Sequence, residues 1–368
     1  MAKGARRASI APVQINPISA AVRGISLTLI VGMVGGLLFY WIGAPAPFML
    51  GSLLICWVTA ALIKPLRHRM DTPQSVRRVF LTAVALILGS YATPQILASA
   101  ASWWPSLLGL AVSSTVMMAV SYWYFARFRG YEPAVAWFSA QPAGLTEMII
   151  MSREHTDKDY LVALFHLVRV STIFLLTPLI IWVGAPELNP QAVPAGQVHI
   201  WQVPLLDWPW WLGLGIAGVI LGKLLRLPMP FLLGPMVLSA VVSGSGLVAL
   251  DRPFEVVCLI QVALGGGIGV RMGQVDFRAL SRAVPDAYIN ASIVIGVALM
   301  AAGGLSLWTG EPMLKLFLAI SPGGVSELSL LAVALGYEVA FVTLHHLWRM
   351  AYVLGTMPLW RKVLWRTG

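Results

Sequence analysis

The chain has 368 residues, of which 58% are hydrophobic and only 11% are charged, with a mean hydropathy of +0.80. Soluble proteins carry about 25% charged residues, so this composition excludes an ordinary soluble domain. The apolar runs are long and continuous rather than alternating, which excludes a β-barrel and predicts an all-α polytopic membrane protein. Cys56 and Cys258 both fall in apolar runs, so no disulfide framework is expected.

The first predicted element is a polar, basic segment, residues 1–23, which we expect to lie in the cytoplasm. The apolar runs that follow predict four helices, then a segment that carries an unusual motif, then a closing helix. These elements lie near 24–42, 47–63, 79–97, 103–126, 133–151 and 160–183. Residues 184–207 are rich in proline and contain Glu187 and Asp207 but no Lys or Arg, so we interpret them as a linker.

The second part of the chain repeats this order. Its elements are predicted near 209–225, 230–250, 254–270, 286–308, 312–333 (the motif segment) and 339–360, ahead of a basic end at 361–368. Seven landmarks recur 183 positions on: Gly32, Gly35, Pro45, Pro47, Phe48, Leu50 and Gly51 return as Gly215, Gly218, Pro228, Pro230, Phe231, Leu233 and Gly234. We therefore predict two repeats, residues 24–183 and 208–360.

The motif itself reads Pro-x-Gly-x-(Thr/Ser)-Glu, and a His-Leu-x-Arg group begins nineteen positions after the glutamate. Pro142, Gly144, Thr146, Glu147, His166, Leu167 and Arg169 recur 180 positions on as Pro322, Gly324, Ser326, Glu327, His346, Leu347 and Arg349. Ionisable residues are costly in hydrocarbon, so their double occurrence in so apolar a chain predicts a functional site.

The basic residues decide how the two repeats face. If the motif segments cross the membrane, sixteen Lys and Arg fall inside and seven outside; if each segment enters and leaves on one side, twenty-one fall inside and two outside. Basic residues gather in cytoplasmic loops. We therefore predict two inverted repeats of about five transmembrane helices plus one re-entrant broken segment each, with linker 184–207 outside. The net charge of +10 then reflects topology rather than a nucleic-acid partner.

A Pro-x-Gly break frees backbone groups that lipid cannot satisfy, so it is tolerated only inside protein or beside a water-filled cavity. Secondary transporters place two such segments near the membrane midplane. Two roles stay open: Glu147 pairs with Arg169 and Glu327 with Arg349 to hold the broken segments, or these residues bind solute and protons. The candidate binding residues are Glu147, Arg169, Glu327, Arg349, His166, His346, Thr146 and Ser326, with the backbone at Pro142, Gly144, Pro322, Gly323 and Gly324.

Two residue types in these regions also have a plain structural interpretation. His166 and His346 either relay protons or pack as hydrogen-bonded histidines. Gly265, Gly269 and Gly273 are spaced four apart, which favours close helix packing over nucleotide binding.

This doubled motif, with Pro-Phe-x-Leu-Gly ahead of each copy, resembles the AbrB-type bacterial membrane protein family over nearly all of residues 25–360. The copies differ at the break, where Ala143 in the first corresponds to Gly323 in the second. The resemblance implies two family labels, ammonia monooxygenase and regulator of gene expression. The residues predict neither directly, because six scattered histidines offer no copper or iron site and no soluble basic module is present for DNA.

The sequence therefore predicts a secondary transporter in the bacterial cytoplasmic membrane, which moves a small anionic or zwitterionic solute. Arg169 and Arg349 would favour the anionic group, and Glu147 and Glu327 would couple protons or cations. The alternative is a membrane-embedded solute sensor that affects gene expression indirectly, and a membrane monooxygenase is least favoured. We expect no enzyme activity, metal, cofactor or direct nucleic-acid partner; the partners are the lipid bilayer and the solute, and homo-oligomerisation stays open.

Overall fold

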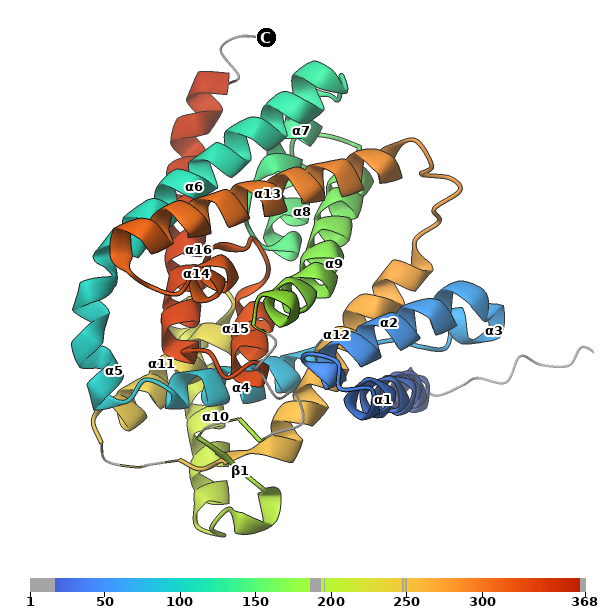
Figure 1. Ribbon diagram of the computed structural model, residues 1–368. Coiled ribbons are helices and arrows are strands. Elements are labelled where there is room, and N and C mark those ends of the chain that lie inside the picture. The colour runs from blue at the N-terminus through green and yellow to red at the C-terminus, as the bar shows by residue number, and fades with distance from the viewer. Residues whose placement is uncertain (1–16, 186–192, 195, 247, 249, 365–368) are drawn as a thin grey trace, which may run out of the picture.

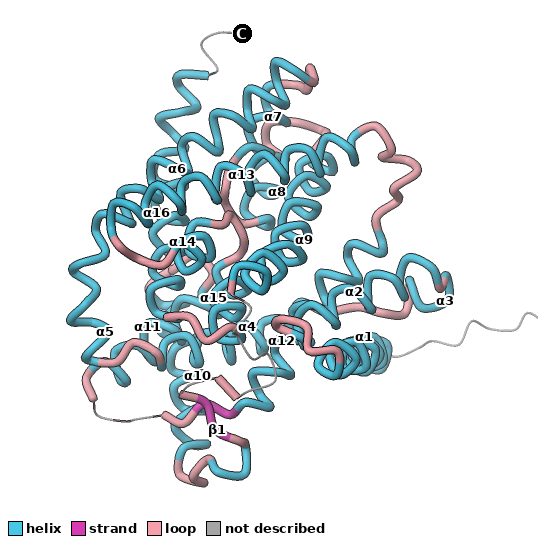
Figure 2. The backbone as a smooth tube through the Cα atoms, in the orientation of Figure 1, coloured by secondary structure: helices cyan, strands magenta, loops and turns pink. Residues whose placement is uncertain are grey.

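The computed structural model describes residues 17–364, except 186–192, 195, 247 and 249. Most of the predicted N-terminal segment, the middle of the predicted linker and the last four residues therefore lie outside the described residues. The described chain is all-α, as predicted (Figures 1 and 2). Its strands, β1 (Gln197–Val198) and β2 (Arg252–Pro253), form one short parallel pair beside the linker.

The first half of the chain, residues 17–185, forms helices close to the predicted ranges. They are α1 (Pro17–Trp41), α2 (Pro47–Leu62), α3 (Lys64–Arg67), α4 (Gln74–Ser90), α5 (Pro94–Ser99), α6 (Trp104–Trp123), α7 (Pro133–Ala140), α8 (Leu145–Ser152) and α9 (Asp159–Gly184). The 3₁₀ turn η1 (Ala100–Trp103) precedes α6, and the π turn η2 (Tyr124–Phe128) extends it.

The second half, residues 193–364, begins with strand β1 and the 3₁₀ turn η3 (Ile200–Gln202) and then repeats the order of long helices and two short motif helices. Its helices are α10 (Asp207–Leu224), α11 (Pro230–Gly244), α12 (Phe254–Gln274), α13 (Ala283–Thr309), α14 (Met313–Ile320), α15 (Val325–Ala334) and α16 (Val339–Leu364). Proline fixes several helix starts, because its ring presets the helical φ angle and its missing N–H is not needed in the first turn.

Three predicted helices have bounds that differ from the structure. Helix α1 begins at Pro17 rather than near 24, and α11 ends at Gly244 rather than near 250. The expected helix near 79–97 ends instead at Ser90, and Pro94 starts α5 after Thr93 caps it, with the Thr93 hydroxyl accepting from the backbone N–H of Ile96 at 3.5 Å. The same helix starts earlier than predicted, so Arg77 lies in its first turns rather than in a loop.

Within the described ranges, five helical stretches are long and apolar enough to cross a membrane. They are Val22–Trp41, Pro94–Phe128, Asp159–Gly184, Phe254–Gln274 and Ala283–Thr309, and shorter apolar helices lie at Pro47–Leu62, Pro230–Gly244 and Val325–Ala334. These helices agree with a polytopic membrane protein of the all-α class. The count of ten crossings stays a prediction.

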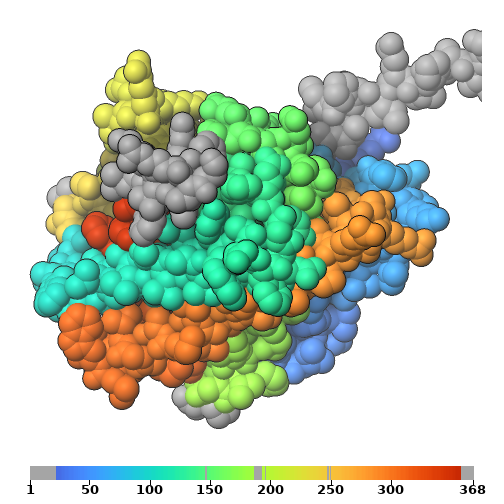
Figure 3. Space-filling model, turned by 90° about the horizontal axis from the view of Figure 1, so that it is seen from above, coloured from blue at the N-terminus to red at the C-terminus, as the bar shows by residue number. Residues whose placement is uncertain are grey.

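The helices form two groups, which Figure 1 shows as the lower and upper parts of the molecule. In the lower group, α2 packs on α1 and α12, and α11 packs on α10 and α4. In the upper group, α13 packs on α6, α9 and α14, while α7, α8 and α16 complete the layer. Figure 3 shows α6 and α13 side by side along one face. Each group contains helices from both halves of the chain.

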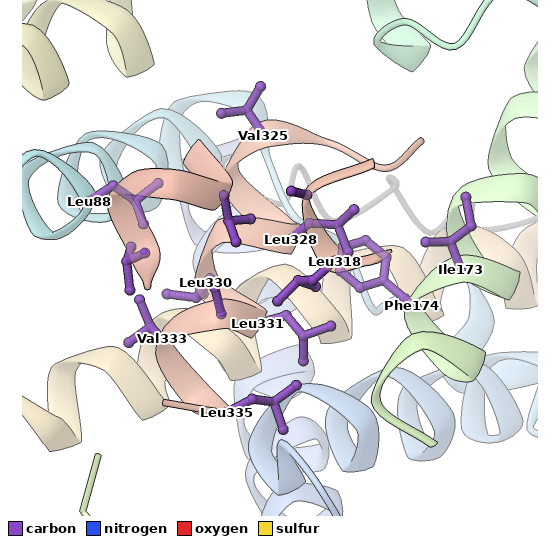
Figure 4. Packing of buried hydrophobic residues seen from close by; sticks show 14 of the residues in the cluster. Leu88, Ile173, Phe174, Leu318, Val325, Leu328, Leu330, Leu331, Val333 and Leu335 are labelled. Carbon is purple, nitrogen blue, oxygen red and sulfur yellow. The ribbon is translucent and has the colours of Figure 1, made fainter. Parts of the chain in front are cut away.

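Helix α15 lies where the two groups meet, and its side chains form the centre of the largest hydrophobic core (Figure 4). Leu328, Leu330 and Leu331 of α15 are fully buried and belong to the same cluster as Leu88 of α4 and Phe174 of α9. Short helix α15 is thus enclosed by long helices of both groups.

Close approach of α12 to α2 depends on glycine. A Cβ atom at Gly265, Gly269 or Gly273 would overlap backbone or side-chain atoms of α2. This agrees with the packing role predicted from their spacing of four.

Candidate functional site

Each motif segment is a pair of short helices separated by a non-helical break. The break between α7 and α8 spans 141–144, and the break between α14 and α15 spans 321–324. A proline at the second position of each break has no backbone N–H to continue the helical ladder. The residues between the short helices therefore leave carbonyl groups that need other donors.

Each motif segment returns to the place from which it starts. In the first half, Glu132 just before α7 accepts a hydrogen bond from the Thr156 hydroxyl (3.4 Å) and pairs with Lys158 (3.4 Å), and both partners precede α9. In the second half, Lys315 in the first turn of α14 pairs with Glu338, which directly precedes α16, at 2.6 Å. The two ends of each broken segment are thus tied together, which is the local geometry that a re-entrant segment requires.

In the first half, His166 and Arg169 of α9 hold the end of α7. Arg169 is 1% exposed, and its Nη1 donates to the carbonyl of Ser139 and its Nη2 to that of Ala143, both at 3.4 Å. Arg169 Nη2 also lies 2.7 Å from His166 Nδ1, while His166 Nε2 lies 2.9 Å from the carbonyl of Phe138. Because arginine only donates, Nδ1 accepts and Nε2–H donates to the carbonyl. His166 is thus a buried, doubly bonded histidine.

In the second half, the arginine alone holds the break. Arg349 of α16 donates from Nη1 to the carbonyls of Ile320 (3.2 Å) and Ser321 (2.6 Å), and from Nη2 to that of Gly323 (2.6 Å). His346 is fully buried, yet neither ring nitrogen has a hydrogen-bond partner of ordinary geometry among the described residues, although the carbonyl of Leu318 lies nearby. The two histidines of the motif are therefore not equivalent.

The glutamates lie at the other side of each break, at the third position of α8 and of α15. The carboxylate of Glu147 folds back over Gly144, and that of Glu327 folds back over Gly324. A carboxylate is stabilised there, because the free N–H groups give a helix N-terminus a partial positive charge. Glu327 Oε2 also accepts a hydrogen bond of 2.7 Å from the Ser326 hydroxyl.

The expected ion pairs do not form in this structure. No carboxylate oxygen of Glu147 lies within 4.0 Å of Arg169, and the same holds for Glu327 and Arg349; the ion pairs among the described residues involve other partners. The reason is that backbone groups at each break carry partial charges opposite to those of the arginine and the glutamate. Carbonyls at the end of the first short helix attract the guanidinium, and N–H groups at the start of the second attract the carboxylate.

Both breaks line one cavity of about 90 Å³, which we call the motif cavity. Of the predicted site residues, those that line it are Pro142, Gly144, Glu147, Gly323, Gly324, Ser326, Glu327, His346 and Arg349. Arg169, His166 and Pro322 do not line it, and the side chain of Thr146 lies outside what the structure describes. Residues 180 positions apart in the sequence thus meet around one small space.

Two further arginines line the motif cavity, and the sequence did not single them out. Arg77 belongs to α4 and Arg271 to the last turn of α12, so both come from the lower group of helices. In the sequence they counted only as cytoplasmic loop charges. The available signal was the position of Arg271, directly after the glycine-rich apolar run 265–270.

Among the described residues, no group of three or more His, Cys, Asp or Glu side chains is placed to hold a metal ion. The arrangement instead offers charged and backbone groups that can bind a small polar solute.

Comparison with known proteins connects the motif geometry to a family. A family model described as "Transition state regulatory protein AbrB" matches residues 54–364. An Escherichia coli (strain K12) protein named "Putative regulator AbrB" is 25% identical over 330 residues, which cover 87% of this chain and 90% of the relative. A Bacillus subtilis (strain 168) protein named "Uncharacterized protein YhjN" is 23% identical over 357 residues, with 91% of each chain covered.

Proposed function

The chain belongs to the AbrB family, and we propose that it is a secondary transporter of a small anionic or zwitterionic solute in the bacterial cytoplasmic membrane. One observation carries the proposal: the breaks of two separate motif segments line the same cavity. Transporters with discontinuous helices bind solute at such meeting points, where free backbone groups and helix ends supply charge without extra side chains.

The packing of the helices supports a two-fold arrangement of the halves. Helix α2 of the first half packs on α12 of the second, and α11 of the second packs on α4 of the first. In sequence order α2 corresponds to α11 and α4 to α12, so the two contacts exchange when the halves are exchanged. Inverted repeats that rock around a shared site are a common design of secondary transporters.

We assign the proton or cation coupling to Glu147 and Glu327. Both carboxylates line the motif cavity at the start of a short helix, and Glu327 is 8% exposed. We propose no catalytic step, metal or cofactor for this chain.

The test is solute flux in proteoliposomes. Purified protein is reconstituted with a pH gradient, and uptake of radiolabelled pyruvate and alanine is followed with and without the gradient. We expect gradient-dependent uptake of at least one probe and its loss in Glu327→Gln. Glu154→Gln is the matched control, because Glu154 is exposed and does not line the motif cavity. If uptake of both probes does not depend on the gradient and is no faster than in empty vesicles, the result contradicts transport of small carboxylates.

The second candidate function is a membrane-embedded solute sensor. The name of the Escherichia coli relative, "Putative regulator AbrB", favours it. A sensor would bind the solute in the motif cavity without moving it across the membrane. Saturable binding to purified protein, together with flux no higher than in empty vesicles, would favour the sensor over the transporter.

A further inference from the structure

Two arginines that line the motif cavity, Arg77 and Arg271, have no role in the site described above. Arg349 is engaged by three backbone carbonyls, and Arg169 does not line the cavity. Arg77 and Arg271 do line it, and both also line a smaller neighbouring void with Glu327. Both side chains are half-buried.

These two arginines form no ion pair with a described residue. Among the described residues, neither Arg77 nor Arg271 has a carboxylate oxygen within 4.0 Å. Arg271 Nε donates to the carbonyl of Gly267 at 3.1 Å, which fixes the side chain, and no other hydrogen bond joins it to a described residue. Its terminal nitrogens are thus free to bind a ligand in the cavity.

The two glutamates of the cavity form no ion pair with these arginines, although Glu327 is near enough to Arg271 to interact with its charge. Glu147 and Glu327 fold back onto the glycines at the start of their own short helices. The cavity therefore brings two positive charges close enough to repel each other, and the single charge of Glu327 does not balance both. Like charges at close range repel, and a shared anion removes that cost.

A third group points to a ligand independently of the charges. His346 is fully buried and lines the motif cavity; the carbonyl of Leu318 lies beside its ring, which leaves at least one ring nitrogen without a partner among the described residues. Buried polar groups are nearly always hydrogen-bonded, so such an exception needs an explanation. A bound molecule with oxygen atoms would supply the missing partner.

Size and lining restrict the molecule. An apolar cavity of about 150 Å³ holds benzene, so the motif cavity of about 90 Å³ suits a solute of about three to six non-hydrogen atoms. Apolar side chains such as Ile268, Val170 and Met350 form much of the remaining wall. The solute thus combines one anionic group with a short apolar body.

We propose that Arg77 and Arg271 form a clamp for the carboxylate of a short-chain carboxylic acid or amino acid in the motif cavity. The inference rests on the proposed function and names the substrate class and its binding residues. A planar guanidinium matches a carboxylate with two parallel hydrogen bonds, which a point charge cannot do. The motif arginines Arg169 and Arg349 then hold the breaks, while residues outside the motif select the solute.

Binding to the purified full-length protein tests the clamp. The probes are pyruvate, alanine, chloride and inorganic phosphate, and the readout is the dissociation constant from ligand-dependent thermal stabilisation. We expect pyruvate or alanine to stabilise the wild type, and Arg271→Gln and Arg77→Gln to weaken that binding by about 10- to 100-fold. Comparison of pyruvate with alanine distinguishes a carboxylic acid from an amino acid as the ligand, because alanine also carries an ammonium group that can face Glu147 or Glu327.

Two further variants distinguish a loss of ligand binding from a general loss of structure or charge. Arg78→Gln is the matched control, because Arg78 neighbours Arg77 but is exposed and lies over the ring of Phe231 at 4.8 Å. It should bind as the wild type does. Arg271→Lys keeps the charge but not the planar fork, so it should fold normally and bind with intermediate affinity, whereas a purely structural Arg271 would show unchanged affinity in folded Arg271→Lys.

Three outcomes would overturn the clamp: unchanged affinity in folded Arg77→Gln and Arg271→Gln, no stabilisation of the wild type by either carboxylate, or equal stabilisation by chloride or phosphate. Measurement of solute flux in proteoliposomes distinguishes failure of the clamp from failure of the proposed transport function. Uptake that survives in both variants leaves the transporter standing without the clamp, while lost binding in the variants and no wild-type uptake leaves the clamp standing without transport.

Discussion

The carboxylate of Glu327 lies so close to Gly324 that a methyl group on that glycine would overlap its oxygen Oε2. The same relationship joins Glu147 to Gly144, 180 positions earlier. In both places the glycine is the last residue before a short helix and has an extended backbone with negative φ. Glycine is thus required here for the space that its missing side chain leaves, not for an unusual backbone angle.

Replacement of Gly324 by alanine should therefore displace the Glu327 carboxylate from the helix start without breaking the fold. We expect solute binding to fall by about tenfold or more, since about 1.4 kcal/mol of lost interaction is a factor of ten. The measurement is binding to purified protein, with thermal stability in detergent recorded in parallel.

Gly355→Ala is the control, because nothing lies within 4 Å of a Cβ atom at that position of α16. It should bind as the wild type does. Wild-type affinity in Gly324→Ala would show that the position of the Glu327 carboxylate does not matter for binding.

Arg169 and Glu147 should contribute independently to stability. Arg169 bonds to backbone carbonyls and His166, whereas Glu147 lies at the start of α8. Arg169→Gln should lower the free energy of unfolding by about 1.5–3 kcal/mol, the usual worth of hydrogen bonds to a charged group. Adding Glu147→Gln should give additive losses, because the two groups share no partner. Recovery of stability in the double variant, measured by thermal unfolding in detergent, would instead show that the two side chains form an ion pair in the membrane.

The sequence was a good guide to the elements and to the existence of a site. The motif segment predicted at 133–151 is α7 and α8, which end at Ser152, and the helix predicted near 160–183 is α9, Asp159–Gly184. Hydrophobic runs and proline positions determine such ranges locally. The helix predicted near 79–97 was wrong, because a threonine cap and a proline interrupt a run that remains apolar beyond them.

Contacts between the motif residues were harder to predict. Opposite charges at corresponding places suggested Glu–Arg pairs, yet a broken helix creates backbone charges of both signs that sequence patterns do not display. The inequality of His166 and His346 was likewise hidden, because the residue pattern of the two copies is the same. Arg77 and Arg271 enter the cavity from helices outside the motif, which only the packing of the two groups could show.

The helix contacts α2–α12 and α4–α11 should both depend on glycine. A Cβ atom at Gly269 would overlap the carbonyl of Leu53, and one at Gly89 would overlap the carbonyl of Met236, which lies 183 positions after Leu53. Gly269→Ala and Gly89→Ala should each destabilise the protein by about 1–3 kcal/mol, the usual cost of overpacking. Gly296→Ala in α13 meets nothing within 4 Å and should be neutral or stabilising. Thermal unfolding in detergent measures all three, and equal behaviour would mean that the helices separate more easily than their packing indicates.

Membrane orientation is the next expectation to test. Twenty-one basic residues on one side and two on the other predict that the C-terminus is cytoplasmic and that the linker 184–207 is external. Reporter fusions after Gly196 and after Gly368 should therefore report opposite sides of the membrane. Reports from the same side would eliminate the inverted arrangement and with it the two-fold basis of the proposed transport.

The two short helices α8 and α15 have different surroundings, which should be visible in chemical labelling. Ile150 of α8 is 59% exposed, whereas Leu330, at the corresponding place 180 positions on in α15, is fully buried. A cysteine at position 150 should react with N-ethylmaleimide at least about tenfold faster than one at position 330, since burial blocks thiol reactivity. Native Cys56 and Cys258 are buried and provide a low background.

A second labelling prediction at positions 150 and 330 follows if the two inverted repeats alternate between an exposed and a buried state. If α8 and α15 exchange surroundings during transport, saturating solute should slow labelling at position 150 and speed it at position 330, because the states are linked by one equilibrium. Thermal unfolding of Leu330→Cys confirms that the fold is intact. Labelling that stays fast at 150 and slow at 330 with bound solute would show that the difference is a fixed property of the fold, and alternation of the two helices would then be wrong.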